Sequence, residues 1–318
     1  MNLIKTFQKY MRQEWLLLIL LGVLLLVAMG FEPNFLKAKS QLKLSENIWE
    51  LAILCLPMTL IIITGGIDLS IGSTMALATV AFGMGFEANW PLWACALAAL
   101  LASLAAGAVN GALIAGIKVH PLIVTLATLA AYRGIAEGLS KGFSVSPLPE
   151  SFQALSGSFL GAPIAAWIFI VLAIVFYLFL AHTPWGRFCH AIGHNEQVCR
   201  FSGAPTSKII FSLYVVSAGL AGIAALLYSA RRNTANPEAG YNMELDVITA
   251  VVIGGTSIYG GRGTIYGTLI GIVLIHEMRE FFNWRWSSDE LNLIVVGSLL
   301  IGSVLFYQLM APKGKETK

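Results

Sequence analysis

Residues 51–86 read LAILCLPMTLIIITGGIDLSIGSTMALATVAFGMGF. Two continuously apolar runs flank an interruption, residues 64–73, which contains glycines and the charged residue Asp68. A membrane span needs ~20 mostly apolar residues, and lipid offers the backbone of such a run no hydrogen-bond partner outside its own helix. The stretch therefore predicts two membrane helices separated by a glycine-containing break.

The composition of the whole chain agrees with a membrane protein. Of its 318 residues, 57% are hydrophobic and 12% are charged, and the mean hydropathy is +0.76. Soluble domains carry about 25% charged residues, and a soluble globule could not cover this much apolar surface. These values exclude a soluble enzyme, a nucleic-acid-binding domain and a disordered linker. The net charge of +3 implies no polyanionic partner.

Ten apolar segments predict an all-α polytopic membrane protein with about ten transmembrane helices. They cover residues 15–31, 48–64, 70–86, 92–116, 121–139, 162–182, 209–228, 244–256, 265–280 and 290–310. Residues 92–116 are rich in alanine and glycine, and small residues let membrane helices approach closely. We expect one compact transmembrane domain, residues 1–318, because no low-complexity tract or separate soluble domain interrupts the chain.

Basic residues near the two ends orient the chain. Ten spans place both ends on one side, and the positive-inside rule makes that side the cytoplasm, together with the polar connection 183–208. The supporting residues are Lys5, Lys9, Arg12, Lys313, Lys315 and Lys318, whereas Lys37, Lys39 and Lys43 would lie outside. No small-residue cleavage site ends the first apolar run, so residues 15–31 are expected to remain as the first span.

The break at residues 64–73 has a counterpart at residues 254–264, where a second glycine-rich stretch divides an apolar region. Glycine-broken hydrophobic segments in both halves of a chain indicate a transport pathway, often built from an inverted repeat. The helix count places both breaks on the cytoplasmic side, so the inverted repeat stays a possibility. The alternative is two unrelated helix connections.

Asp68 is the most informative single residue. A carboxylate at membrane depth is costly and usually faces a cavity or a partner. Gly65 and Gly66 permit non-helical backbone beside it. Asp68 is therefore expected either to contact a substrate or to act as the N-cap of the following helix.

Other charged residues are expected near the interfaces. Arg231 and Arg232 precede Glu244 and Asp246 on one outer loop, where arginines either bind carboxylates of an external partner or are simply solvated. Glu244 and Asp246 suit a helix N-terminus and point to different faces. Near the end of the ninth segment, Glu277 and Glu280 flank Arg279, which predicts local ion pairing rather than a deep proton relay.

The connection 183–208 is much longer than a tight turn. Residues 195–201 predict a short amphipathic helix with Val198 and Phe201 on one face, ended by Gly203. This helix either docks a cytoplasmic protein or lies on the membrane surface. Cys189, His190, His194 and Cys199 lack the tight spacing of a metal site, so no metal is expected.

The sequence carries little sign of catalysis. It contains no GxxxxGK[ST] or HExxH pattern, so the chain has no phosphate-binding loop and no visible metalloprotease site. A GxSxG match at residues 138–142 ends an apolar segment rather than following a strand, so it does not indicate a hydrolase site. We expect no catalytic residue and no cofactor in this chain.

Four motifs together resemble the permease family of bacterial ABC sugar importers, of the ribose, xylose, arabinose and autoinducer-2 type. They are GGIDLSIGS at 65–73, VHPLIVTL at 119–126, GRFCHAIGHNEQVCRFSG at 186–203 and ITAVVIGGTSIYGGRGTIYGTLIG at 248–271. The resemblance covers nearly the whole chain. It implies a helix arrangement like that of the vitamin B12 importer permease, in the bacterial inner membrane.

The resemblance also implies partners. These are a cytoplasmic ABC ATPase that carries ATP and Mg²⁺, a periplasmic sugar-binding protein, and a second permease that is either an identical copy or a sister chain, all in a lipid bilayer and without nucleic acid. ATP binding would close the ATPase dimer, and residues 186–203 would pass that motion to the membrane helices. Sugar would then move by alternating access.

The resemblance assigns expected roles to particular residues. Residues at the family's ATPase-docking positions are Gly186, Arg187, Gly193, Asn195, Glu196, Arg200 and Gly203. The expected translocation pathway comprises Gly65, Gly66, Asp68, Ser70 and Thr125, and the expected docking site for the binding protein comprises Arg231, Arg232 and Glu244. Val198, Cys199 and Phe201 depart from the family's usual small residues and leucine.

Two other classes remain as alternatives. A secondary transporter would explain the broken helices but not the long connection 183–208, and it would need more buried titratable groups. A non-transporting scaffold would not need glycine-broken helices. The sequence does not identify the sugar.

Overall fold

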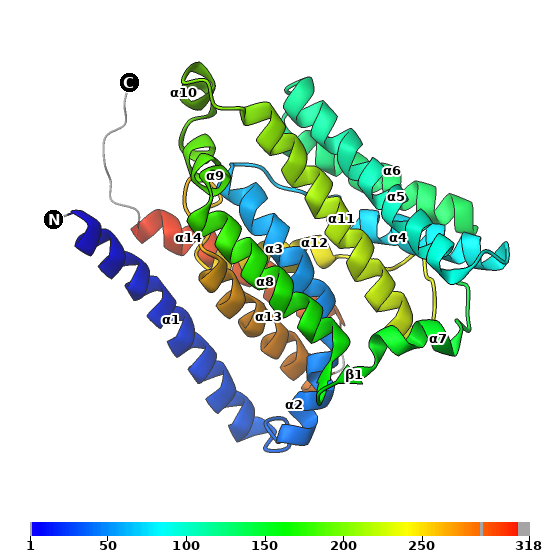
Figure 1. Ribbon diagram of the computed structural model, residues 1–318. Coiled ribbons are helices and arrows are strands. Elements are labelled where there is room, and N and C mark those ends of the chain that lie inside the picture. Colours follow the sequence, from blue (N-terminus) through cyan, green and yellow to red (C-terminus); the bar gives the residue numbers. More distant parts are fainter. Residues whose placement is uncertain (1, 287–288, 311–318) are drawn as a thin grey trace.

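The computed structural model describes residues 2–286 and 289–310, which form a bundle of α-helices (Figure 1). The α-helices are α1 (Asn2–Phe31), α2 (Ala38–Leu44), α3 (Trp49–Ile63), α4 (Ile71–Glu87), α5 (Leu92–Gly111), α6 (Pro121–Ser140), α7 (Glu150–Gln153), α8 (Ile164–His182), α9 (Pro184–His194), α10 (Glu196–Phe201), α11 (Thr206–Arg232), α12 (Met243–Ile253), α13 (Ile265–Trp286) and α14 (Asp289–Met310). The shorter elements are the 3-10 turns η1 (Ser45–Asn47) and η3 (Ala154–Ser156), the π-helical turn η2 (Ala112–Gly116), and the antiparallel strands β1 (Ser158–Phe159) and β2 (Ala162–Pro163).

Helix length supports fewer full spans than the ten predicted. Within the described residues, the helices long and apolar enough to cross a membrane are Leu92–Gly116, Pro121–Ser140, Ile164–His182 and Thr206–Arg232. A fifth results if Lys39–Asn47 and Trp49–Ile63, bent by 52°, form one span. The other predicted segments form helices that fall short of this standard. For example, α12 has 11 residues, or ~16 Å, about half of a ~30 Å hydrocarbon core.

The predicted interruption is present, and a second connection meets it. Helix α3 ends at Ile63 and α4 begins at Ile71, while residues 233–242 separate α11 from α12. A Cβ atom on Gly72 would lie 2.3 Å from the carbonyl oxygen of Gly240. The first turns of α4 and α12 are therefore close together.

The helix pairs α3–α4 and α11–α12 are each interrupted by a connection, and the two pairs run in opposite directions. The start of α3 lies beside the end of α11, because Glu50 is ion-paired with Arg231. The other end of α3 lies near α9, and there Ile63 O accepts a hydrogen bond from Gly261 N at 2.8 Å. The breaks at 64–73 and 254–264 are thus at the same end of the bundle, as the helix count predicted. The oppositely directed counterpart of the connection 64–70, which follows α3, is the connection 233–242, which follows the antiparallel helix α11.

Small residues make the bundle compact, as predicted. Helix α3 is buried along residues 50–63. Where α5 meets α11, a Cβ atom on Gly107 would lie 2.6 Å from Tyr214 O, and one on Gly111 would lie 2.8 Å from the Phe211 ring. The two backbones can approach this closely only because glycine has no side chain.

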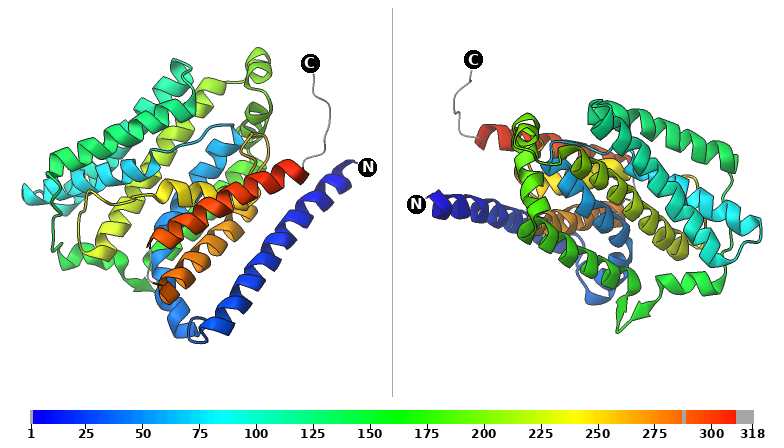
Figure 2. Two further views of the ribbon diagram at one scale, coloured as in Figure 1. Left: turned by 180° about the vertical axis from the view of Figure 1, so that it is seen from behind. Right: turned by 45° about the horizontal axis from the view of Figure 1, so that its top comes forward.

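The start of α1 and the end of α14 lie toward the side of the bundle that carries α9 and α10 (Figures 1 and 2). The cytoplasmic placement of both termini stays a prediction. Lys313, Lys315 and Lys318 lie outside the described residues, and no side chain is described for Lys5, Lys9 or Arg12.

Candidate functional site

A buried carboxylate lies in the connection between α3 and α4. Asp68 is 3% exposed. Its Oδ1 accepts hydrogen bonds from Ser70 N at 3.0 Å and Ser70 Oγ at 2.7 Å, and its Oδ2 accepts one from Ser217 Oγ at 3.0 Å. The N-cap of α4 is Ser70, not Asp68. Of the two alternatives for Asp68, the N-cap is therefore wrong: its carboxylate binds the N-cap residue Ser70 and reaches across to Ser217 of α11.

Side chains from α5 and α6 extend this polar centre. Asn110 Nδ2 donates to Ser70 Oγ at 2.8 Å, and the Tyr132 hydroxyl lies 3.2 Å from Asn110 Oδ1. We call Asp68, Ser70, Asn110, Tyr132 and Ser217 the Asp68 cluster. All five side chains are buried, so the cluster is a closed hydrogen-bonded unit in this conformation.

The backbone beside the cluster is held separately. Ile67 O accepts hydrogen bonds from Thr125 Oγ1 at 3.1 Å and from the Tyr214 hydroxyl at 3.5 Å. Gly65 has φ +83°, and a Cβ atom on Gly66 would lie 2.8 Å from the Tyr214 hydroxyl. The structure thus brings Gly65, Gly66, Ser70 and Thr125 together beside Asp68, and their role in a translocation pathway stays a prediction.

Sequence reasoning missed Asn110, Tyr132, Tyr214 and Ser217. Each is a polar residue within a predicted membrane segment, which is the signal that could have marked them. Their partners could not have been identified, because Ser217 and Asp68 are 149 residues apart in the chain.

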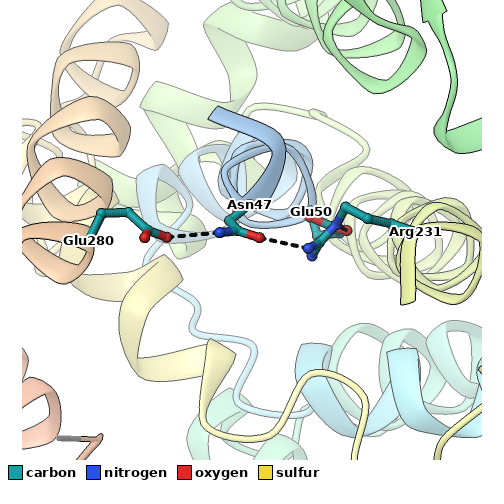
Figure 3. Close-up of polar contacts among 4 residues, drawn as sticks. All are labelled: Asn47, Glu50, Arg231 and Glu280. Carbon is teal, nitrogen blue, oxygen red and sulfur yellow. Dashed lines mark hydrogen bonds and ion pairs between the residues drawn. The ribbon is translucent and has the colours of Figure 1, made fainter. Parts of the chain in front are cut away.

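Arg231 points toward Asn47 and Glu50 (Figure 3). Its Nε lies 2.9 Å from Glu50 Oε1, and its Nη1 donates to Asn47 Oδ1 at 2.7 Å. Asn47 Nδ2 in turn donates to Glu280 Oε1 at 3.2 Å. We call Asn47, Glu50, Arg231 and Glu280 the Arg231 network. It links the ends of η1, α3, α11 and α13.

The other residues predicted to dock a binding protein divide between surface and interior. Arg232 is exposed and lies over the Tyr228 ring, 5.9 Å from its centroid. Glu244 is 9% exposed and faces Gly72 rather than an open surface, since its Oε2 would lie 2.6 Å from a Cβ atom there. Of the three predicted docking residues, Arg232 is the exposed one, and docking of a binding protein stays a prediction.

The acidic residues around Arg279 do not pair with it locally. Arg279 Nη1 is ion-paired with Asp246 Oδ2 of α12, while Glu280 belongs to the Arg231 network. The predicted ion pairing of Arg279 with Glu277 and Glu280 is therefore wrong, because tertiary packing offers Arg279 a partner on a neighbouring helix. Glu244 and Asp246 do lie in the first turn of α12 with different neighbours, as predicted.

Residues 184–201 form two helices rather than one. Helix α9 begins after Thr183, whose Oγ1 accepts a hydrogen bond from Gly186 N at 3.1 Å, with Pro184 at its first position. This start follows ordinary capping chemistry, although no helix was predicted over residues 184–194. Burial raises the pKa of the Cys189 thiol to about 12 and lowers the pKa of the His190 ring, so both groups are neutral near pH 7.

The second helix, α10, matches its prediction. Asn195 Oδ1 accepts a hydrogen bond from Val198 N at 3.0 Å as the N-cap, and Gly203 follows the helix with φ +83°. Val198 is 58% exposed and Phe201 is 84% exposed. The helix therefore presents an apolar surface at one end of the bundle.

The predicted docking residues occupy different places on this unit. Arg187 and Arg200 are exposed, and Glu196 Oε1 is ion-paired with Lys118 Nζ at 2.7 Å. Gly186 is buried against the carbonyl oxygens of Phe179 and Leu180, and Gly193 lies against Ile63 and Gly261. The charged members face outward, whereas these two glycines allow α9 to pack on the bundle.

Comparisons with known proteins cover almost the entire chain. Residues 47–304 match the family described as branched-chain amino acid transport system, permease component. The chain is 36% identical to the ribose import permease protein RbsC of Escherichia coli K12, over 94% of this chain and 96% of that protein. It is 34% identical to RbsC of Bacillus subtilis 168, over 90% and 89%, and 32% identical to the autoinducer 2 import system permease protein LsrD of Escherichia coli HS, over 91% of each.

Proposed function

The chain belongs to this family of membrane permease components, and from that premise we propose that it is the transmembrane subunit of an ATP-driven, binding-protein-dependent importer of a monosaccharide or a related polyol-like molecule. The observation that carries the proposal is the match along 90–94% of the chain to permeases named for ribose and autoinducer 2 import. As a permease subunit the chain is a transport component and not an enzyme.

The Asp68 cluster is the proposed centre of the translocation pathway. A sugar offers several hydroxyl groups, and the cluster holds hydroxyl, amide and carboxylate groups at a helix break. In the described conformation these groups bond to one another. We propose that alternating access separates the helices that carry them, so that sugar hydroxyls replace the internal hydrogen bonds.

The partners follow from the same premise. A cytoplasmic ABC ATPase with bound ATP and Mg²⁺ would dock on α9 and α10, a periplasmic sugar-binding protein would dock on the opposite end beside Arg232, and a second permease copy or sister chain would complete the pathway. Both termini would then lie in the cytoplasm and the protein in the bacterial inner membrane. About ten membrane-crossing or membrane-embedded segments, arranged as in the vitamin B12 importer permease and with an inverted repeat, complete the proposal.

Purification of the tagged chain from its native membrane in mild detergent tests this proposal. We expect a co-purifying protein with the GxxxxGK[ST] pattern, and ATP-dependent uptake in proteoliposomes when labelled ribose, xylose, arabinose and galactose are tried together with the binding protein. Uptake by this chain alone, without ATP, would overturn the proposal in favour of a secondary transporter.

A further inference from the structure

Helix α9 touches both glycine-rich breaks of the chain at one point. A Cβ atom on Gly193 would lie 1.9 Å from Ile63 O and 2.3 Å from Gly261 N. Ile63 is the last residue of α3, and Gly261 lies in the connection between α12 and α13. The final turn of α9 is therefore in backbone contact with two segments that are far apart in the sequence.

Further contacts close the same point. Gly261 N donates to Ile63 O at 2.8 Å, and His190 Nδ1 lies 3.2 Å from Gly261 O. A Cβ atom on Gly260 would lie 2.9 Å from Gly193 O and 3.1 Å from the Cα atom of Gly65. We call Ile63, Gly65, His190, Gly193, Gly260 and Gly261 the α9 junction.

Each break leads away from this junction into the bundle. From Ile63 the chain continues through Gly65 to Ser70, whose hydroxyl belongs to the Asp68 cluster. From Gly261 the chain leads to α12 on one side and α13 on the other, and α12 carries Asp246, the partner of Arg279. Because packed backbone deforms little, a displacement of α9 must move both connections or separate them from it.

We infer that the α9 junction couples the two broken segments into one unit, so that a movement of α9 and α10 reaches the Asp68 cluster and the α12–α13 connection together. This inference rests on the proposed function, in which the moving partner is the ATPase. Gly193, Gly261 and His190 are then positioning residues for transport. Gly193 is required because any side chain there would push α9 away from Ile63.

Hydrogen–deuterium exchange on the detergent-purified permease–ATPase complex tests the inference without knowledge of the sugar. Peptides covering residues 64–70 and 255–263 are compared with and without a non-hydrolysable ATP analogue. The amide of Gly261 is a direct reporter, because its hydrogen bond to Ile63 O crosses the junction. We expect the analogue to change exchange in both peptides. A change in one peptide alone, or in neither, would overturn the inference.

Variants separate the junction from the docking of the ATPase. Gly193→Ala should keep the ATPase bound but lose the nucleotide-dependent change in both peptides. Gly134→Ala is the matched control, since a Cβ atom there would meet nothing within 4 Å, and it should behave like the wild type. His190→Phe removes the contact with Gly261 O without a backbone clash at Gly193. It should weaken the nucleotide-dependent change in exchange, and it provides the test if Gly193→Ala does not fold.

The outcomes distinguish the inference from the proposed function. If no ATPase co-purifies with the wild-type chain, the proposed function fails and the inference fails with it. If the ATPase binds and the nucleotide analogue changes hydrogen exchange in both peptides equally in the wild type, in Gly193→Ala and in His190→Phe, the inference alone is wrong.

Discussion

Asp68 shows how a single carboxylate can organise a helix break. It accepts three hydrogen bonds, two from Ser70 and one from Ser217, while remaining 3% exposed. Asp68→Ala would leave these buried donors without partners, which costs about 1–3 kcal/mol for each unsatisfied group. We expect a clearly lower melting temperature in detergent and a loss of uptake.

Asp68→Asn is the matched control for this prediction. Its amide oxygen can still accept the bonds from Ser70, and its amide group can donate to Ser217 Oγ, so most of the stability should return. Ser217→Ala should cost about 1 kcal/mol. An Asp68→Ala variant that melts like the wild type would show that the carboxylate does not hold the break together.

Glu196 and Arg187 allow a test of docking that does not involve stability. The Lys118–Glu196 pair has side chains 36% and 40% exposed, and exposed pairs contribute about 0–1 kcal/mol. Glu196→Ala and Arg187→Ala should therefore insert and melt normally but lower ATP-dependent uptake. Lys118→Ala controls for the ion pair itself and should stay near wild type. Wild-type uptake in both Glu196→Ala and Arg187→Ala would contradict a role of these residues in docking.

At the scale of the element, α10 depends on its cap. It spans Glu196–Phe201, and a helix this short is not stable by propensity alone. Asn195→Ala removes the acceptor of the Val198 amide, which costs about 1 kcal/mol. We expect a smaller fraction of ATPase to be retained in a pull-down. Asn195→Asp preserves the cap and should retain the wild-type amount, and equal retention by all three proteins would exclude an ordered α10 as the docking element.

The Arg231 network ties several elements at their ends. Glu50 has a side chain 4% exposed, and that of Arg231 is 21% exposed. Removing one partner of a buried ion pair costs about 3–5 kcal/mol, because the other charge is left uncompensated. Arg231→Ala should therefore melt well below the wild type. The double variant Glu50→Gln with Arg231→Gln should recover part of this loss, and a double variant that is less stable than Arg231→Ala would contradict the pairing.

The elements also show what sequence can predict. Caps are local, so Asn195 and Gly203 indicated the ends of α10, and runs of apolar residues indicated most of the helices. Helix α9 was missed although Thr183 and Pro184 carry a start signal, because Gly186 and Gly193 resemble loop residues until their packing is known. The partner of Arg279 was predicted wrongly for a similar reason. Asp246 lies 33 residues away in the chain, whereas sequence spacing points only to Glu277 and Glu280 beside Arg279.

At the scale of the whole molecule, the oppositely directed helix pairs α3–α4 and α11–α12 meet at the connections that interrupt them. Helices α3 and α11 are antiparallel, and the connections that follow them meet where Gly72 lies against Gly240. The Asp68 cluster lies beside this contact, and the α9 junction lies at the far end of α3. A movement at one end of the bundle therefore has a backbone route to the polar centre.

The orientation of this bundle in the membrane can be tested by labelling its two ends. The β1–β2 hairpin and α10 lie at opposite ends of the molecule (Figure 1), and Leu160 in the hairpin is 79% exposed. If α10 faces the cytoplasm, an impermeant maleimide applied to spheroplasts should label Leu160→Cys but not Ser202→Cys. Both variants are made in a Cys199→Ser background, since Cys199 is a half-buried thiol on α10 itself. Permeabilised cells provide the control, because Ser202→Cys should then react as well. Labelling of Ser202→Cys in intact spheroplasts, with Leu160→Cys protected, would reverse the orientation and would place α10 out of reach of any cytoplasmic ATPase.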